Sequence, residues 1–213
     1  MKNKTKLPTF NYERVLWNKG IANIVGIDEV GRGSWAGPVV AGAVIFDKEL
    51  ITRFNDVGLG TIRDSKLLSP KHRKKLSKLI KDHAKAYAIS EISVERINKW
   101  GIGKSSQYAF RKAVKQLSIK PDHFLVDAFY IRYINKRNQT PIIKGDMKSF
   151  TIAAASIIAK VYRDKLMVKL GSKYPKYSFA KHKGYGTKLH QQEVKENGLS
   201  AVHRTSFNIK ALQ

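Results

Sequence analysis

The chain has 213 residues, of which 42% are hydrophobic, and this suits one large domain, or one domain with an appendage, rather than a disordered chain. Lys and Arg number 41 against 16 Asp and Glu, so the formal net charge is +25. Because so high a charge governs partners rather than fold, we expect a polyanion as partner, either nucleic acid or an anionic membrane surface.

The sequence favours a cytoplasmic protein. No apolar run approaches the roughly 20 residues that a membrane span requires. No apolar block follows the basic residues at the start, as a signal peptide would need, and the absence of cysteine excludes disulfides and cysteine-based metal sites. Nothing in the sequence indicates an obligate oligomer, so a monomer is expected.

The first half of the chain predicts two paired strands, a helix and a third strand. Residues 24–28 and 38–46 are rich in Val and Ile, and the glycines between them predict a hairpin-like pair with a long connection. Ser69 followed by Pro70 is typical of a helix start. Alternation of apolar residues over 86–93 predicts the third strand.

The second half predicts a helix, two short strands and a long helix. Helical spacing of apolar residues predicts a helix over 105–117, and short apolar runs predict strands over 123–129 and 141–146. The segment 149–170 is almost entirely apolar at its start, so its first turns should be buried against a sheet. This order of elements predicts an α/β fold with a mixed sheet.

The sequence after residue 170 changes in composition and predicts a basic helical appendage over residues 171–213. A short helix is expected from Thr187, its cap, to Asn197–Gly198. Aromatic residues stand among the lysines and are favoured to dock the appendage rather than to stack on bases: Tyr174, Tyr177 and Phe179.

Acidic residues stand at three predicted strand ends. The first strand finishes at Asp28, with Glu29 next to it, the fourth finishes at Asp127, and the fifth finishes near Asp146. Ligands of α/β sheets bind at strand ends, and a buried carboxylate is costly unless it is paired or binds a metal. No Lys or Arg stands at strand spacing beside Asp28 or Asp127. The pattern therefore favours hard divalent cations, of which two would suit phosphodiester chemistry.

Each acid also has a structural alternative. Asp146 or Ser149 could cap the following helix, and Asp127 could bind turn amides. Four acids at three strand ends of an acid-poor chain are harder to explain in this way, so a shared metal site remains the favoured interpretation.

The sequence Gly31-Arg32-Gly33 bears on how two adjacent acids could serve one site. Neighbouring residues of a strand point to opposite faces. Asp28 and Glu29 would therefore reach one centre only if the chain turned there, and Gly31 and Gly33 would permit such a turn. Its backbone N–H groups would also suit a phosphate or a sugar hydroxyl.

Five motifs together resemble those of ribonuclease HII, a type 2 ribonuclease H, in order and spacing. They are "GIDEVGRGSWAGPVVAGAVI", "DSKLLS", "FLVDAF", "KGDMKSFTIAAASIIAKVYRDKLM" and "FAKHKGYGTKLH". The resemblance runs from about Leu16 to Phe207. It implies an RNase H-like fold, with a central mixed five-stranded sheet flanked by helices in a catalytic domain over residues 1–170. Residues 171–213 would then contribute to substrate binding.

The resemblance also implies an activity. An enzyme of this family is an endonuclease that hydrolyses the RNA strand of RNA–DNA hybrids and incises 5′ to single ribonucleotides embedded in duplex DNA. The expected products carry 3′-hydroxyl and 5′-phosphate ends. Two Mg²⁺ or Mn²⁺ ions per site are expected.

The resemblance assigns roles residue by residue. The family's metal ligands match Asp28, Glu29, Asp127 and Asp146. The turn that reads the 2′-hydroxyl of the junction nucleotide, which separates RNA from DNA, matches Gly31, Arg32 and Gly33, and the tyrosine that packs on that sugar matches Tyr185. Positions that line the nucleic-acid path match Lys66, Lys144, Ser149, Lys181 and Lys183.

Departures from the family pattern leave the shape of the substrate groove open. Ala128-Phe129 follows the third acid where Gly-Asn is frequent, and Ser34-Trp35 stands where Pro-Leu is common. Two rival functions remain: a basic nucleic-acid-binding protein without catalysis, which leaves the acids unexplained, and a metal-dependent DNA nuclease or integrase of similar fold. Surface or structural roles are favoured over acid–base roles for His182, His190 and His203.

Overall fold

A mixed five-stranded sheet forms the centre of the structure, a computed structural model that describes residues 7–209. In spatial order the strands are β3 (Ala86–Ile92), β2 (Val39–Ile45), β1 (Ile24–Val30), β4 (His123–Asp127) and β5 (Gln139–Ile142). Strand β2 runs antiparallel to both of its neighbours, whereas β1, β4 and β5 run parallel to one another. The predicted α/β fold with a mixed five-stranded sheet is confirmed.

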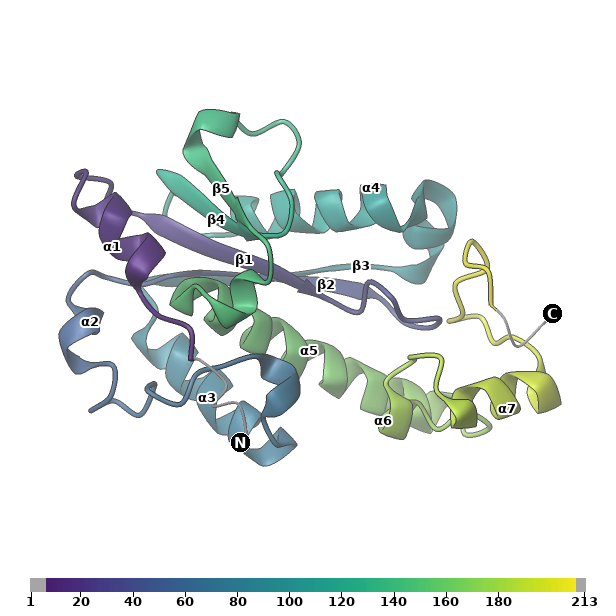
Figure 1. The fold of residues 1–213 in the computed structure, drawn as a ribbon. Coiled ribbons are helices and arrows are strands. Elements are labelled where there is room, and N and C mark those ends of the chain that lie inside the picture. The colour runs from purple at the N-terminus through teal and green to yellow at the C-terminus, as the bar shows by residue number, and fades with distance from the viewer. Residues whose placement is uncertain (1–6, 210–213) are drawn as a thin grey trace, which may run out of the picture.

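Helices cover both faces of the sheet (Figure 1). One face packs against α4 (Val94–Lys115), and the other packs against α5 (Phe150–Lys173), with α3 (Pro70–His83) beside it. The remaining helices are α1 (Asn11–Trp17), α2 (Leu50–Arg53), α6 (Phe179–His182) and α7 (Lys188–Asn197). No helix within residues 7–209 is long and apolar enough to cross a membrane.

Helix α5 lies unusually close to the sheet because two strand residues opposite it are glycines. A Cβ atom on Gly26 would lie 2.2 Å from the carbonyl carbon of Thr151, and one on Gly42 would lie 2.3 Å from the carbonyl oxygen of Ala155. The first turns of α5 are buried, as predicted. Since strand residues alternate between faces, Asp28 lies on the same face of β1 as Gly26 and so faces α5.

The bounds of α4 and β5 differ most from the predicted ones. The helix expected over 105–117 begins at Val94, and Gly101, at φ +74°, interrupts it. Strand β5 ends at Ile142 rather than near Asp146. Lys144 adopts the left-handed conformation, and Gly145–Met147 form a 3-10 helix. Asp146 therefore lies on a turn beyond the strand, because the chain must reverse there to enter α5.

The appendage docks on α5 and on the loop between β1 and β2. Tyr177 and Phe179 are buried in a small core that includes Ala36, Met167 and Val194. This confirms the docking interpretation for these two aromatic residues. Helix α7 begins after Thr187, whose hydroxyl accepts a hydrogen bond from the His190 N–H, as predicted. The expected boundary after residue 170 falls within the last turn of α5.

A buried carboxylate that the sequence analysis did not single out fixes the start of α5. Glu13 of α1 is fully buried, and its Oε1 accepts hydrogen bonds from the Ser149 hydroxyl at 2.7 Å, the Thr151 N–H at 3.0 Å and the Thr151 hydroxyl. A negative charge at a helix N-terminus also interacts favourably with the helix dipole. Glu13 thus anchors the segment that directly follows Asp146.

Replacing Glu13 by Ala should lower the free energy of unfolding by about 3 kcal/mol, because buried donors would lose a charged acceptor. Urea unfolding followed by circular dichroism measures this. The control is Glu49→Ala, because Glu49 is exposed and makes no cap hydrogen bond to α2, and its cost should stay within about 0.5 kcal/mol. Equal costs for the two variants would contradict the anchoring role.

Candidate active site

The four predicted acids line one cavity of about 440 Å³. Asp28 and Glu29 come from β1, and Asp127 comes from the end of the parallel strand β4. Asp146 reaches the same cavity from the 3-10 helix that follows β5. Chain segments about 100 residues or more apart in the sequence therefore place their carboxylates around one cavity.

The predicted turn lies later in the chain than expected. Strand β1 continues in register through Val30, so the chain does not turn between Asp28 and Glu29. It turns at Gly31, at φ +89°, where a Cβ atom would also lie 2.0 Å from Nε of Arg163. Gly33 has no such constraint, because a Cβ atom there would meet nothing within 4 Å. Glu29 lines the cavity nonetheless, close to the end of the strand.

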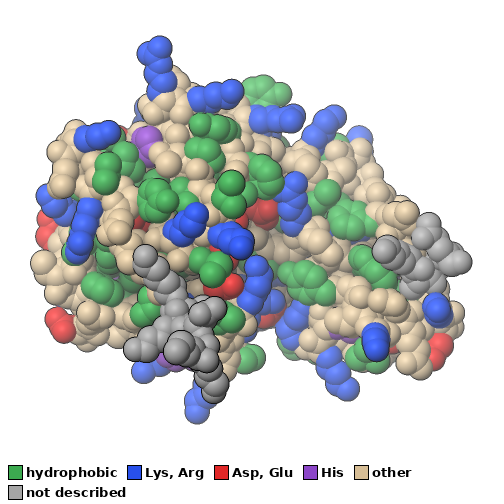
Figure 2. Space-filling model, viewed as in Figure 1, with side chains coloured by type: hydrophobic (Ala, Val, Ile, Leu, Met, Phe, Trp, Pro, Cys, Tyr) green, Lys and Arg blue, Asp and Glu red, His purple; other side chains and the backbone are tan. Residues whose placement is uncertain are grey.

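Burial and mutual repulsion raise the pKa values of the acids. The pKa of Asp28 lies well above its ordinary value, first because the side chain is buried and then because Glu29 and Asp127 lie near it. Burial is also the main cause of the raised pKa values of Glu29, Asp127 and Asp146. Viewed as in Figure 1, the molecule shows acidic side chains near the middle of this face, among Lys and Arg (Figure 2).

Little positive charge in the protein offsets these acids directly. Among the ion pairs of residues 7–209, only one involves an acid of the site, between Glu29 Oε1 and Arg32 Nη1 at 3.5 Å. The charge of Lys66 lowers the pKa of Asp127 and Asp146, but less than burial raises them. Like charges that are buried together need a cation, and carboxylate oxygens are the ligands that Mg²⁺ and Mn²⁺ prefer.

The donor set fits such ions in its chemistry but does not yet form a closed ligand shell. Within the described chain, no three acidic or histidine side chains stand at metal-ligand spacing. One oxygen of Asp127 also accepts a hydrogen bond from the Gly145 N–H at 2.7 Å, as the turn-amide alternative predicted. The four carboxylates thus surround a common space and would have to draw together around an ion.

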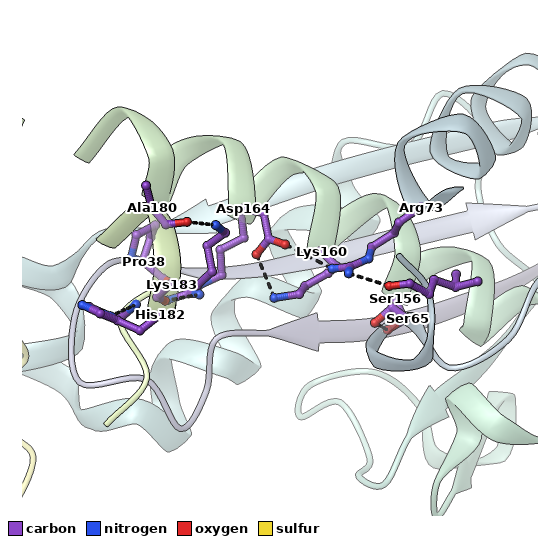
Figure 3. Close-up of polar contacts among 12 residues, drawn as sticks. Pro38, Ser65, Arg73, Ser156, Lys160, Asp164, Ala180, His182 and Lys183 are labelled. Carbon is purple, nitrogen blue, oxygen red and sulfur yellow. Dashed lines mark hydrogen bonds and ion pairs between the residues drawn. The ribbon is translucent and has the colours of Figure 1, made fainter. Parts of the chain in front are cut away.

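Helix α5 supplies cavity residues that the sequence analysis missed. Ser156 and Lys160 line the cavity from successive turns of the helix, and the Ser156 hydroxyl lies 3.1 Å from that of Ser65 (Figure 3). Lys160 Nζ bonds Asp164 Oδ1 at 2.7 Å, and Arg73 bonds the other oxygen of Asp164 at 3.1 Å (Figure 3). Ser156 and Lys160 lie four positions apart in a helix that is otherwise largely apolar there. This spacing puts them on one face of the helix, and the sequence pattern could have indicated that they belong to the site.

Two fully buried arginines connect the glycine turn to the appendage. Arg163 of α5 donates to the carbonyls of Pro38, Ala36 and Lys183, at 2.9, 3.1 and 2.9 Å. Arg163 and the second arginine, Arg204, bind backbone carbonyls rather than carboxylates. Their role is therefore to position the chain.

Arg204 completes this connection from the C-terminal side. It donates twice to the carbonyl of Gly37, at 2.8 and 3.0 Å, and once to that of Arg32, at 2.9 Å. The path of the backbone around Arg32 therefore depends on a residue more than 170 positions further along the chain.

Tyr185 lines the same cavity as the acids. Its ring centroid lies 5.7 Å from Lys160 Nζ and 5.6 Å from Arg163 Cζ. Nδ1 of His190 lies 3.0 Å from the Tyr185 carbonyl oxygen, and Nε2 of His190 lies 3.0 Å from Nε2 of His203. Burial lowers the pKa of His190 to about 4, so this residue is neutral at pH 7 and serves a structural role.

The residues expected along the nucleic-acid path are dispersed. Lys66 lines the cavity, whereas Lys144 and Lys181 are exposed outside it and Lys183 lines a neighbouring hollow. Ser149 is fully buried, caps α5 and bonds Glu13, so it cannot contact a substrate in this structure. A helix cap was the alternative that its position before an apolar run had indicated.

Comparison with known sequences decides the family. Residues 25–210 match the family described as Ribonuclease HII. A curated Ribonuclease HII from Caldicellulosiruptor bescii is 43% identical over 198 residues, which are 93% of this chain and 92% of the relative. The chain belongs to the ribonuclease HII family. It therefore has ribonuclease HII activity, which cleaves RNA in RNA–DNA hybrids and at embedded ribonucleotides.

Solved structures agree with this assignment at the level of the fold. The ribonuclease H2 from Pyrococcus horikoshii OT3 superposes with a TM-score of 0.71 at 27% identity, covering 88% of this chain and 94% of that one. Bst-RNase HIII, solved in complex with Mn²⁺, gives a TM-score of 0.66 at 20% identity, covering 90% and 69%. The RNase H-like fold is thus confirmed.

The raised pKa of Asp28 has a testable consequence for the metal-free protein. Because the folded state binds the proton more tightly than the unfolded state, stability falls as pH rises above the ordinary aspartate pKa of about 3.9. Asp28→Asn removes this loss. In EDTA at pH 8 the variant should be more stable than the wild type by more than about 1 kcal/mol, and the difference should shrink towards pH 4.

Urea unfolding at both pH values measures the difference. The matched control is Asp56→Asn, because Asp56 is exposed and makes no ion pair within the described chain. A wild type as stable as Asp28→Asn at pH 8 would show that the Asp28 carboxylate is not destabilising.

Proposed function

We propose that this ribonuclease HII hydrolyses phosphodiesters with two divalent ions held by Asp28, Glu29, Asp127 and Asp146. The observation that carries the proposal is the convergence of four carboxylates with raised pKa values on one cavity, with little compensating charge. It would incise 5′ to a ribonucleotide and leave 3′-hydroxyl and 5′-phosphate ends. Mg²⁺ or Mn²⁺ fits the all-oxygen donor set.

The residues of the cavity would have different roles, according to where they lie. When bound, the ions would supply the charge that activates an attacking water and stabilises the leaving 3′-oxygen. Asp28 and Asp127 directly follow the last residues that pair with each other in the adjacent parallel strands β1 and β4 and would hold the ions from a rigid base. Glu29 and Asp146 would complete the ligand set. Lys66 and Lys160 lie where they attract the phosphate.

The turn formed by Gly31, Arg32 and Gly33, here called the glycine turn, would select the ribonucleotide together with Tyr185. Gly31, Arg32 and Gly33 line the cavity together with Tyr185 and with the acids. Backbone groups of the turn would bond the 2′-hydroxyl, and the ring of Tyr185 would pack on the sugar. The connections through Arg163 and Arg204 hold these two parts together.

The wider surface fits a duplex substrate. Because the protein has a net charge of +25, it should bind nucleic acid strongly, and the affinity should fall steeply as the salt concentration rises. Three lysines outside the cavity would contribute to this electrostatic attraction: Lys144, Lys181 and Lys183. We propose that residues 171–213 extend the substrate surface of a catalytic domain over residues 1–170, and that the enzyme acts as a cytoplasmic monomer.

Asp28→Asn should reduce cleavage of an RNA–DNA hybrid by at least about 10³-fold, because it weakens the site for the ions. Binding of the hybrid in EDTA should stay within about threefold of the wild type, since the phosphate contacts remain. Cleavage of labelled hybrid with and without Mg²⁺ or Mn²⁺, together with fluorescence anisotropy, measures both quantities.

Asp56→Asn is the control for this experiment and should cleave at the wild-type rate. Metal-dependent cleavage retained by Asp28→Asn would contradict the proposed ligand set. An all-DNA duplex of the same sequence separates the rival DNA nuclease, because the proposed enzyme should leave it intact.

Tyr185→Ala and Arg32→Ala should each slow cleavage of a duplex with one embedded ribonucleotide by about tenfold or more. The first removes the ring proposed to pack on the sugar, and the second removes the side chain that pairs with Glu29 in the cavity, each contact being worth about 1–2 kcal/mol. Single-turnover kinetics measure the effect. Tyr12→Ala serves as the control, because Tyr12 is a partly exposed tyrosine of α1 outside the cavity. Cleavage by Tyr185→Ala at the wild-type rate would remove Tyr185 from the recognition site.

A further inference from the structure

A second hollow, separate from the acids, lies where α4 meets the segment that follows β4. Its volume is about 410 Å³. We call it the α4 patch, and it is formed mainly by Trp100, Lys104, Tyr108, Arg111, Arg132 and Tyr133. Its lining combines aromatic rings with cations and contains no acidic residue.

Two arginines in or beside the patch, Arg111 and Arg96, contact aromatic rings rather than carboxylates. The guanidinium carbon of Arg111 lies 5.1 Å from the ring centroid of Tyr133 and 5.8 Å from that of Tyr108. Arg96, at the rim, lies 5.4 Å from the ring of Trp100. Neither arginine belongs to an ion pair within residues 7–209, and Nη1 of Arg111 is buried there without a hydrogen-bond partner. The patch therefore has positive charge that an anionic ligand would offset.

Tyr133 presents its ring to solvent from a backbone that is held in place. The residue is 91% exposed and adopts φ +67°, a conformation that is uncommon for a bulky residue. The preceding Arg132 N–H donates to Oε1 of Gln107 at 2.7 Å, and Nε2 of Gln107 donates to the Tyr130 carbonyl at 2.9 Å. An exposed aromatic ring beside cations, on a backbone whose neighbouring residues are hydrogen-bonded, is an arrangement on which nucleobases stack.

The patch is connected to the catalytic cavity by a short stretch of chain. Asp127 lines the cavity, and the ring of Phe129 lies 4.8 Å from the guanidinium carbon of Arg32. Tyr133 follows Asp127 by six residues, so the chain between them spans at most about 20 Å. A nucleic-acid strand that leaves the cavity on this side could reach the patch within about six nucleotides.

We propose that the α4 patch binds an unpaired stretch of the nucleic acid whose duplex part occupies the catalytic cavity. Bases would stack on Tyr133 and Trp100, and phosphates would lie near Lys104 and Arg132. The proposal rests on the proposed function only in taking the same polymer into both sites. Because every base has a stackable face, RNA and DNA tails are both ligands of the patch.

The aromatic residues are what favour an unpaired segment over a duplex backbone. Bases in a duplex present only their edges to a protein, and a phosphate backbone requires cations alone. Here the exposed rings of Tyr108 and Tyr133 lie at the same hollow as the cations. An unpaired strand offers both base faces and phosphates, and so matches both features.

Binding to an all-DNA duplex with and without a 10-nucleotide single-stranded tail tests the proposal without using cleavage. Fluorescence anisotropy in EDTA should show that Tyr133→Ala weakens binding of the tailed duplex about tenfold, in the range for loss of one stacked base. Tyr133→Ala should bind the blunt duplex as tightly as the wild type does. For the tailed duplex, the slope of the logarithm of the binding constant against the logarithm of the salt concentration should become shallower in Arg132→Ala, by about the amount for one phosphate contact.

Two exposed residues on other elements give matched controls. Tyr87→Ala removes an exposed tyrosine of β3 whose ring also lies beside a cation, Lys81 of α3. Arg53→Ala removes an exposed arginine of α2. Both should bind tailed and blunt DNA as the wild type does. Cleavage of a blunt duplex with one ribonucleotide should be normal in Tyr133→Ala, so failure of the patch is distinguishable from failure of the proposed function.

Two results would overturn the proposal. If Tyr133→Ala binds the tailed duplex as tightly as Tyr87→Ala does, the patch holds no unpaired strand. If Tyr133→Ala weakens blunt and tailed duplexes equally, the patch contacts duplex rather than single strand.

Discussion

The site depends on one constraint, the burial of Asp28 between β1 and α5. Gly26 and Gly42 let the helix approach the sheet closely, and this approach removes the Asp28 carboxylate from water. Glu29 and Asp127 add negative charge beside it, so burial and repulsion act in the same direction on its pKa. A carboxylate held in this way favours a cation, and the same packing that stabilises the fold thereby prepares the site.

The side of the cavity that Gly31, Arg32, Gly33 and Tyr185 line is held by a different interaction. Buried guanidinium groups of Arg163 and Arg204 bind carbonyls of the loop between β1 and β2. Arg163 also binds the carbonyl of Lys183, two residues before Tyr185. The glycine turn and Tyr185 come from opposite ends of the chain, and these hydrogen bonds set their relative position. Flexible charged contacts could not hold two segments this closely, because surface ion pairs contribute little.

The sequence was sufficient for features that local patterns determine. Acids at the ends of apolar runs predicted the cavity, and the Ser69-Pro70 and Thr187 starts predicted two helices that the structure contains. The extent of β5 was wrong because the reversal at Lys144 depends on contacts with α5 and Asp127 that no local pattern reveals. Glu13 was missed for the same reason, since its partners lie more than 130 residues away.

If the buried carboxylates are unfavourable until a divalent ion binds among them, Mn²⁺ should stabilise the folded protein through these side chains. Thermal unfolding of the wild type, followed by circular dichroism without nucleic acid, should show a melting temperature that rises with Mn²⁺ concentration. The rise should be lost in Asp28→Asn. An equal rise in the wild type and in Asp28→Asn, or none in the wild type, would contradict the account.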